Sequence, residues 1–175
     1  MPKQLLSHGG VPLAAVAVEA MRPHVEQVVL AGSGPVPDEL GDLHRLPDPL
    51  DVSGPLAGVL AAMRWAPESA WVVAACDMPQ ISCEAVGWLI HQRRPGTWAV
   101  LPRSDEGRVE PLLAVYEPQS RPLLEEQAAA GLWGLRRLAE NDRVACPTPP
   151  PELAGAWVNV NTPEEIGRLQ RSDVS

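Results

Sequence analysis

The feature that most constrains the fold of this chain is an uninterrupted apolar run over residues 71–76, followed at once by Asp77, Met78 and Pro79. A short, continuous apolar segment that ends in a turn is typical of a strand buried on both faces of a sheet. Such strands occur where helices cover both faces of a parallel sheet. The run therefore predicts an α/β fold in which Asp77 follows a central strand.

Helix-like and strand-like segments alternate along the rest of the chain. Apolar residues at helical spacing predict helices over residues 12–25, 54–66, 84–93 (with Ser82 as the N-cap), 121–130 and 135–141. Apolar and β-branched runs predict strands over residues 27–31, 71–76, 97–101, 109–116, 143–146 and 157–161. Alternation of this kind predicts a three-layer α/β fold with a mostly parallel sheet, in one domain over residues 1–175. Because the chain opens on a loop and a helix, we expect this sheet to lack the usual first strand.

Composition narrows the classes of partner. The formal charge of −8 disfavours binding to a nucleic-acid backbone, although one site can still hold a small phosphorylated ligand with a divalent cation. No segment reaches the roughly 20 apolar residues that a membrane span needs, and the start has no signal-peptide pattern. We therefore expect a cytoplasmic protein. The three cysteines form no CxxC pair, so the sequence disfavours both a structural zinc site and a disulfide framework.

Polar residues follow several of the predicted strands, and ligands of open α/β sheets bind at the carboxyl ends of strands. Asp77 is the sharpest candidate, because a carboxylate held there suits a magnesium ion that carries substrate phosphates. The alternative is a turn or N-cap aspartate beside Pro79. Ser33, between Gly32 and Gly34, belongs to a loop at the same kind of position.

Two further motifs allow both a binding and a structural interpretation. Gly54 and Gly58 open a helix, where backbone amides favour anions, but small residues there also permit close packing. Asn159 and Asn161 would present two carboxamides on one side of a strand end, or Asn161 would cap the last helix. Lys3 and Asp48 alone indicate only a solvated lysine and a turn.

In combination these motifs resemble the molybdenum cofactor guanylyltransferases over nearly the whole chain. The matching segments are Pro-Lys-Gln-Leu-Leu at 2–6, Gly-Gly-Val-Pro-Leu at 9–13, Asp48, Gly-Pro-Leu-Ala-Gly at 54–58, Cys-Asp-Met-Pro at 76–79, Glu-Pro-Leu-Leu-Ala-Val-Tyr at 110–116 and Asn-Val-Asn-Thr-Pro-Glu at 159–164. The 54–58 and 159–164 segments are the most specific, whereas the 76–79 turn is shared with related nucleotidyltransferases, including cytidylyltransferases.

The resemblance implies a Rossmann-like nucleotidyltransferase that transfers GMP from Mg-GTP to molybdopterin and releases pyrophosphate. It implies that Lys3 contacts the GTP phosphates, that Ser33 and Asp48 contact the nucleotide, and that Asp77 contacts both the nucleotide and Mg²⁺. The pterin side would consist of Gly54, Gly58, Asn159 and Asn161. Lys3 and Asp77 would then be the catalytic pair, with cofactor-delivery proteins or molybdoenzymes as further partners.

The sequence departs from the family at two places. Family members begin with a strand and a Gly-rich loop that wraps the triphosphate just before the lysine, and this chain starts where that loop should end. Either the start codon lies too far downstream or the chain is a truncated or degenerate paralogue. Ser33 stands where the family commonly has asparagine near the guanine. Two alternatives therefore remain: a non-catalytic molybdopterin-binding protein, and a cytidylyl or sugar-phosphate nucleotidyltransferase with another acceptor.

Overall fold

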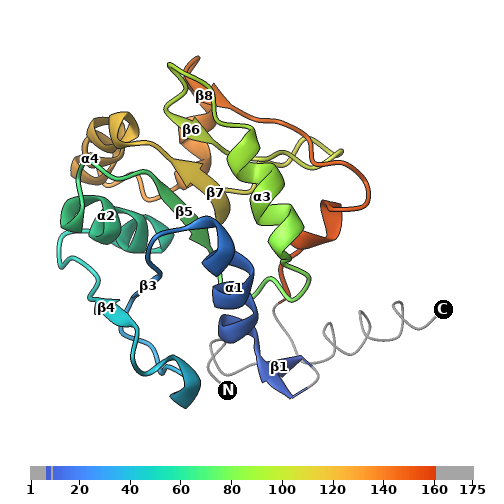
Figure 1. Ribbon diagram of the computed structural model, residues 1–175. Coiled ribbons are helices and arrows are strands. Elements are labelled where there is room, and N and C mark those ends of the chain that lie inside the picture. The colour runs from blue at the N-terminus through green and yellow to red at the C-terminus, as the bar shows by residue number, and fades with distance from the viewer. Residues whose placement is uncertain (1–6, 9, 161–175) are drawn as a thin grey trace.

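The computed structural model describes residues 7–8 and 10–160 of the 175-residue chain (Figure 1). Its α-helices are α1 (Leu13–Met21), α2 (Pro55–Trp65), α3 (Cys83–His91) and α4 (Arg121–Ala129). Its strands are β1 (Ser7–His8), β2 (Val11–Pro12), β3 (Val29–Ala31), β4 (His44–Leu46), β5 (Trp71–Ala74), β6 (Ala99–Val100), β7 (Leu113–Tyr116) and β8 (Val144–Ala145). The 3₁₀ turns are η2 (Arg22–His24), η3 (Asp38–Leu40), η4 (Pro118–Ser120), η5 (Leu135–Glu140) and η6 (Ala154–Trp157).

The main sheet has four strands in the order β5-β7-β6-β8. β6 and β8 are parallel, whereas β7 is antiparallel to both of its neighbours, β5 and β6. β3 and β4 form a separate parallel pair, and β1 and β2 a short antiparallel one. This mixed sheet with helices on both sides confirms the predicted α/β class. The antiparallel step between β6 and β7 follows from the connection across 103–108, where Arg103 bridges to Val109.

The sheet separates two hydrophobic clusters. On one side α2 and α4 pack together, and on the other α1 packs against α3 (Figure 1). Successive residues of β7 point to opposite faces, so Ala114 and Tyr116 join the α2 side while Leu113 and Val115 join the α1 and α3 side. This is the three-layer arrangement that the alternating pattern predicts.

Local sequence signals account for several element boundaries. The Ser82 hydroxyl accepts a hydrogen bond from the Ala85 backbone N–H at 3.2 Å, which confirms Ser82 as the N-cap of α3. α2 begins at Pro55, directly after Gly54 with a φ of +68°. Proline suits a first helical turn, and glycine is the residue that most easily adopts a positive φ. The starts of α2 and α3 can be predicted from the sequence because they depend on neighbouring residues alone.

Two expectations about strands are wrong. Residues 71–76 were expected in a fully buried central strand, but all four residues of β5 are only half-buried and β5 lies at the end of the four-stranded order. The cause is a cavity along its outer edge. Residues 157–160 form no strand either: Trp157 ends a 3₁₀ turn because its indole is anchored elsewhere, as described below, and 161 lies outside the described residues.

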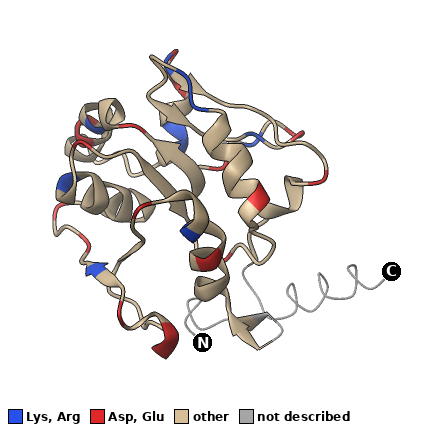
Figure 2. Cartoon of the chain, viewed as in Figure 1, with Lys and Arg blue, Asp and Glu red and all other residues tan. Residues whose placement is uncertain are grey.

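Charged side chains lie on the helices, the connecting segments and, at Arg45, on β4, whereas β5, β6 and β7 carry none (Figure 2). Among the residues that the structure describes, no helix has the length and apolar character needed to cross a membrane.

Candidate nucleotide-binding site

A cavity of about 1000 Å³ lies between β3 and β5. Five of the predicted site residues line it, and they come from four separate segments of the chain: Ser33, Asp48, Gly54, Gly58 and Asp77. Three of these segments follow β3, β4 and β5, so the cavity opens at the carboxyl ends of strands, where α/β sheets bind ligands. A volume of this size suits a nucleotide-sized ligand.

The loop after β3 is positioned by contacts with β4. The Gly32 backbone N–H donates to the Leu46 carbonyl at 2.9 Å, and the Arg45 guanidinium donates to the Gly34 carbonyl at 2.7 Å. Gly32 has a φ of +103°, and a Cβ built on it would lie 3.8 Å from Asp48 Oδ2. The loop that carries Ser33 therefore lies beside Asp48, as a shared nucleotide site requires. Sequence reasoning missed Arg45, whose role depends on the β3–β4 pairing.

The two glycines at the start of α2 have different surroundings. A Cβ built on Gly54 would meet nothing within 4 Å, so this position is open on the cavity side. A Cβ on Gly58 would lie only 3.2 Å from the Cβ of Ala31 in β3. Close packing of α2 on β3 is therefore a sufficient structural reason for Gly58, and its place on the pterin side stays a prediction.

Asp77 connects the cavity to a second polar cluster. Asp77 lines the cavity, and its backbone carbonyl accepts a hydrogen bond from the Val160 N–H at 2.8 Å. That bond brings the segment with Asn159 to the end of β5. Asp77 is half-buried and lies in a turn three residues after the end of β5, so the turn that was expected to present it is present.

The second cluster is built around Glu110, which is 7% exposed. Its Oε1 accepts a hydrogen bond from the Leu112 N–H at 3.1 Å, and its Oε2 accepts one from Asn159 Nδ2 at 3.3 Å. Burial raises the pKa of the Glu110 carboxyl above its usual value, and the Leu112 N–H opposes that shift. The Arg136 and Arg108 charges also oppose it, and the nearby Asp77 charge adds a smaller rise. Asp77 and Glu110 are thus electrostatic neighbours at one end of the sheet.

Asn159 is fixed in this cluster by its sequence neighbours. The Trp157 indole N–H donates to the Leu113 carbonyl at 2.9 Å, and its ring meets Trp88 edge-on at 5.4 Å between centroids. These contacts attach the C-terminal part of the described chain to β7 and α3. Asn159 Oδ1 is buried and accepts no hydrogen bond from the described residues, which leaves an acceptor for a ligand.

The turn that carries Glu110 is itself anchored. The Tyr116 hydroxyl, fully buried, donates to the Pro111 carbonyl at 2.8 Å. Burial, and to a smaller extent the Glu110 charge, raises the pKa of Tyr116 well above its usual range, so the hydroxyl stays a donor. In the sequence, Glu110 and Tyr116 are recognisable only as members of the family motif at 110–116. Their partnership across six residues of chain appears only when the turn before β7 is folded.

Lys3 and Asn161, predicted for the phosphate and pterin sides, lie outside the described residues. Within the described ranges, no group of three or more His, Cys, Asp and Glu residues is arranged to hold a metal ion. Asp77, Glu110 and the Asn159 amide nonetheless offer oxygen donors, which are the ligands that Mg²⁺ prefers. Mg²⁺ commonly takes only one or two protein carboxylates and completes its shell with water and substrate phosphates, so this donor set fits it.

An α/β sheet with a cavity at the carboxyl ends of β3, β4 and β5, and with Asp77 and Glu110 as electrostatic neighbours, is typical of a ligand-binding α/β protein. The chain belongs to the MobA-like NTP transferase family, whose domain model matches residues 1–145. It is therefore a nucleotidyltransferase.

Curated relatives agree with this family. The chain is 32% identical over 177 residues to a protein of Thermococcus gammatolerans named "probable molybdenum cofactor guanylyltransferase", with 97% of this chain and 91% of the relative covered. It is 30% identical over 174 residues to the molybdenum cofactor guanylyltransferase of Pseudomonas putida, with 94% and 86% covered.

A solved structure extends the similarity to the fold. The molybdopterin-guanine dinucleotide biosynthesis protein A of Archaeoglobus fulgidus superposes with a TM-score of 0.76 at 25% identity, covering 99% of this chain and 91% of that one. The resemblance drawn from the sequence motifs is confirmed at the level of the family.

Proposed function

We propose that this protein transfers GMP from Mg-GTP to molybdopterin. In this reaction a terminal phosphate oxygen of molybdopterin attacks the α-phosphorus of GTP. A new P–O bond forms, the bond from the α-phosphorus to the bridging oxygen breaks, and pyrophosphate leaves with that electron pair. The acceptor is already an anionic phosphate, so the reaction needs positioning and charge neutralisation more than a general base.

The observation that carries this proposal is the double connection of Asp77. Asp77 lines the cavity that Ser33 and Asp48 also line, and its backbone holds the segment with Asn159 beside Glu110. One residue thus stands between a nucleotide-sized cavity and a separate polar cluster. A transferase that joins two substrates needs this arrangement, because the reacting atoms must meet between the two binding halves.

The residues take distinct roles in this proposal. Ser33 and Asp48 bind the nucleotide, Gly54 lets the ligand approach the start of α2, and Asn159 with Asn161 binds the pterin. Asp77 holds Mg²⁺, with Glu110 as a second oxygen donor and as the residue that positions Asn159. Bound Mg²⁺ would neutralise the phosphate charge that develops on the leaving pyrophosphate. Lys3 would neutralise the same phosphates.

The experiment is a nucleotide series with pyrophosphate release as the readout. Protein, Mg²⁺ and molybdopterin are incubated with GTP, CTP, ATP or UTP in parallel. We expect release with GTP that depends on both molybdopterin and Mg²⁺. Release with CTP in preference to GTP would replace the guanylyl assignment by a cytidylyl one. Calorimetric binding of molybdopterin without any affinity for Mg-GTP would instead support the non-catalytic alternative.

The same proposal covers the setting of the reaction. We propose that the protein works in the cytoplasm, and that its product passes to molybdoenzymes or to cofactor-delivery proteins. Fractionation of cells, followed by detection of the protein, tests the first point. Co-purification with a molybdoenzyme in a molybdopterin-replete strain tests the second.

A further inference from the structure

The loop after β3, residues 32–34, is held by one side chain of the neighbouring strand. Arg45 Nη2 donates to the Gly34 carbonyl at 2.7 Å and to the Gly32 carbonyl at 3.5 Å, so its two acceptors belong to the residues on either side of Ser33. The parallel pairing of β3 with β4 places Arg45 opposite Leu30, two residues before the loop begins. The position of Arg45 beside loop 32–34 is therefore set by the pairing of the two strands.

Loop 32–34 needs such a contact to hold one conformation. Gly32 and Gly34 have no side chains, and glycine has more backbone freedom than any other residue. Among the described residues, the N–H groups of Ser33 and Gly34 and the Ser33 carbonyl have no hydrogen-bond partner. Because Ser33 and Gly34 line the cavity, these backbone groups are available to a ligand.

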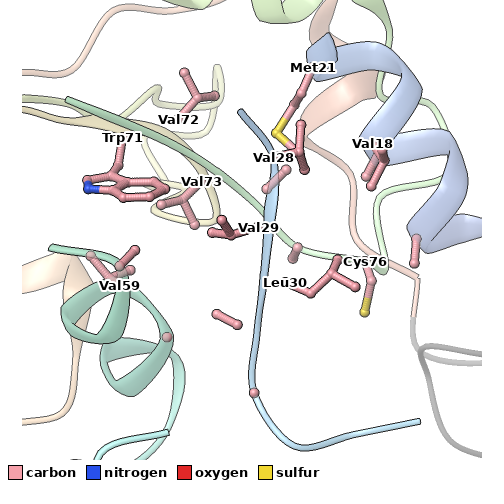
Figure 3. A pocket seen from close by; sticks show the side chains of 18 of the residues that line it. Val18, Met21, Val28, Val29, Leu30, Val59, Trp71, Val72, Val73 and Cys76 are labelled. Carbon is pink, nitrogen blue, oxygen red and sulfur yellow. The ribbon is translucent and has the colours of Figure 1, made fainter. Parts of the chain in front are cut away.

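The side chains of the cavity near this loop do not by themselves distinguish guanine from adenine. Apolar side chains line the middle of the cavity, among them Val29, Leu30 and Val73, and they make no hydrogen bonds (Figure 3). The Asp48 carboxylate accepts a hydrogen bond from the amino group of either base. The Ser33 hydroxyl rotates and can donate or accept, so it also tolerates both bases.

A backbone N–H that is fixed in place does distinguish the two bases. Guanine has an acceptor at O6, where adenine has the N6 amino donor. A fixed N–H donates to O6, but it meets the adenine amino group donor against donor, which leaves both groups unpaired. A mobile loop loses this discrimination, since it can turn a carbonyl towards the adenine amino group instead.

We propose that Arg45 is a specificity-determining positioning residue, which fixes loop 32–34 so that a backbone N–H of Ser33 or Gly34 donates to O6 of guanine. Arg45 acts through the loop and does not itself contact the base. The inference rests on the part of the proposed function that assigns a guanine nucleotide to this cavity. It depends neither on molybdopterin nor on the transfer step.

Three variants test this role. Arg45→Met keeps a long side chain but removes every N–H donor. Arg45→Lys keeps the charge and three donors but loses the planar guanidinium, so it should retain part of the effect. Arg94→Met is the matched control, because the exposed Arg94 also donates to two backbone carbonyls, those of His91 and Arg93, and does not line the cavity.

The first measurement is the ratio of the dissociation constant for Mg-ATP to that for Mg-GTP, obtained by calorimetry. In Arg45→Met this ratio should fall about tenfold, the factor that one hydrogen bond of ordinary strength contributes. It should fall about threefold in Arg45→Lys and stay within about twofold in Arg94→Met. In steady-state kinetics, Arg45→Met should raise the KM for GTP, while kcat with GTP and the KM for molybdopterin stay within about twofold.

The second measurement separates positioning from direct contact with the base. Order parameters of the Ser33 and Gly34 backbone amides are obtained from amide relaxation, without nucleotide, for the unsubstituted protein and for Arg45→Met. They should fall from about 0.85, typical of a rigid backbone, to below about 0.6 in the variant. Unchanged order parameters together with a lowered selectivity would show that Arg45 contacts the base directly, and would overturn the positioning role.

The remaining outcomes separate this inference from the proposed function. A nucleotide ratio in Arg45→Met equal to that in Arg94→Met would overturn the inference, even if the protein transfers GMP to molybdopterin. Equal binding of both nucleotides by the unsubstituted protein would overturn it as well. Selective binding of Mg-GTP that is lost in Arg45→Met, without molybdopterin-dependent release of pyrophosphate, would support the inference and contradict the proposed transfer.

Discussion

The Asp77 carbonyl and the Val160 N–H are joined by a hydrogen bond of 2.8 Å, although 83 positions separate the two residues in sequence. The bond fastens the segment that carries Asn159 to the turn after β5. It therefore makes the geometry of the proposed metal site and that of the proposed pterin side depend on each other. A substitution that shifts the turn with Asp77 should therefore also shift the segment with Asn159, and the reverse.

Asn159→Ala tests the pterin side, and it also removes the Asn159 Nδ2 donor to Glu110 Oε2. The substitution removes a buried amide oxygen that has no donor among the described residues, and it leaves the cavity lined by Ser33 and Asp48 in place. Loss of one hydrogen bond of about 1.4 kcal/mol should raise the KM for molybdopterin about tenfold. The KM for GTP should stay within about twofold of the unmodified protein. Steady-state kinetics with each substrate varied in turn provide the check, and equal changes in both constants would contradict the assignment.

Tyr116→Phe tests the anchoring of the Glu110 turn. The variant keeps the buried ring but leaves the Pro111 carbonyl without its hydroxyl donor. We expect a loss of about 1–2 kcal/mol in the free energy of unfolding, measured by denaturation in urea. Because the same turn positions Glu110 and, through it, Asn159, kcat should fall as well. A variant with lowered stability and an unchanged kcat would show that the hydroxyl has no part in positioning the site.

Gly58→Ala separates packing from ligand contact. The added methyl group would approach the Ala31 Cβ to 3.2 Å, so α2 must shift by a few tenths of an ångström away from β3. We expect a loss of about 1 kcal/mol in stability from this overpacking. Gly134→Ala is the matched control, since its Cβ meets nothing within 4 Å and its φ is negative. A rise in the KM for molybdopterin at unchanged Tm would restore a direct ligand role for Gly58.

Arg64 makes the stability of the α2–α4 contact depend on pH. It donates to Glu125 Oε2 at 2.6 Å and to Asp51 Oδ2 at 3.0 Å. The guanidinium lowers the pKa of both carboxyls, so their stabilisation is full above their ordinary pKa and is lost as pH falls through the lowered values.

In Glu125→Gln, the free energy of unfolding should therefore depend less on pH below about pH 4.5, the range in which an ordinary glutamate titrates. The Arg64 and Glu125 side chains are 33% and 35% exposed, so the effect at pH 7 should be only about 0.5–1 kcal/mol. Urea denaturation from pH 3 to pH 7 measures it. An acid limb with the same slope in both proteins would contradict this account.

The sequence predicts those parts of the molecule that depend on neighbouring residues. The cap at Ser82, the start of α2 at Pro55 and the turn after the apolar run at 71–76 all follow from local propensity and spacing. The family motifs added Asp48 and Ser33, which alone predicted only turns. The structure brings both to one cavity with Asp77.

The rest depends on contacts between distant segments. Trp157 was expected in a strand, but its indole N–H reaches the Leu113 carbonyl, a partner 44 positions away that no local pattern encodes. The importance of Glu110 likewise follows from Asn159, 49 positions away. β5 is only half-buried because a cavity lies along its outer edge. The apolar run predicts that the strand is covered above and below, but it carries no information about the neighbour at its edge.

The central claim is that Asp77 serves both halves of a nucleotidyl transfer site, and Asp77→Asn tests it most directly. The amide keeps the shape of the side chain but removes the charge that would hold Mg²⁺. With GTP, Mg²⁺ and molybdopterin present, we predict a fall of about a hundredfold or more in pyrophosphate release, with an unchanged Tm. Asp142→Asn, in the exposed turn before β8, is the control and should keep the activity of the unsubstituted form. Pyrophosphate release by Asp77→Asn at the rate of that control would contradict the account.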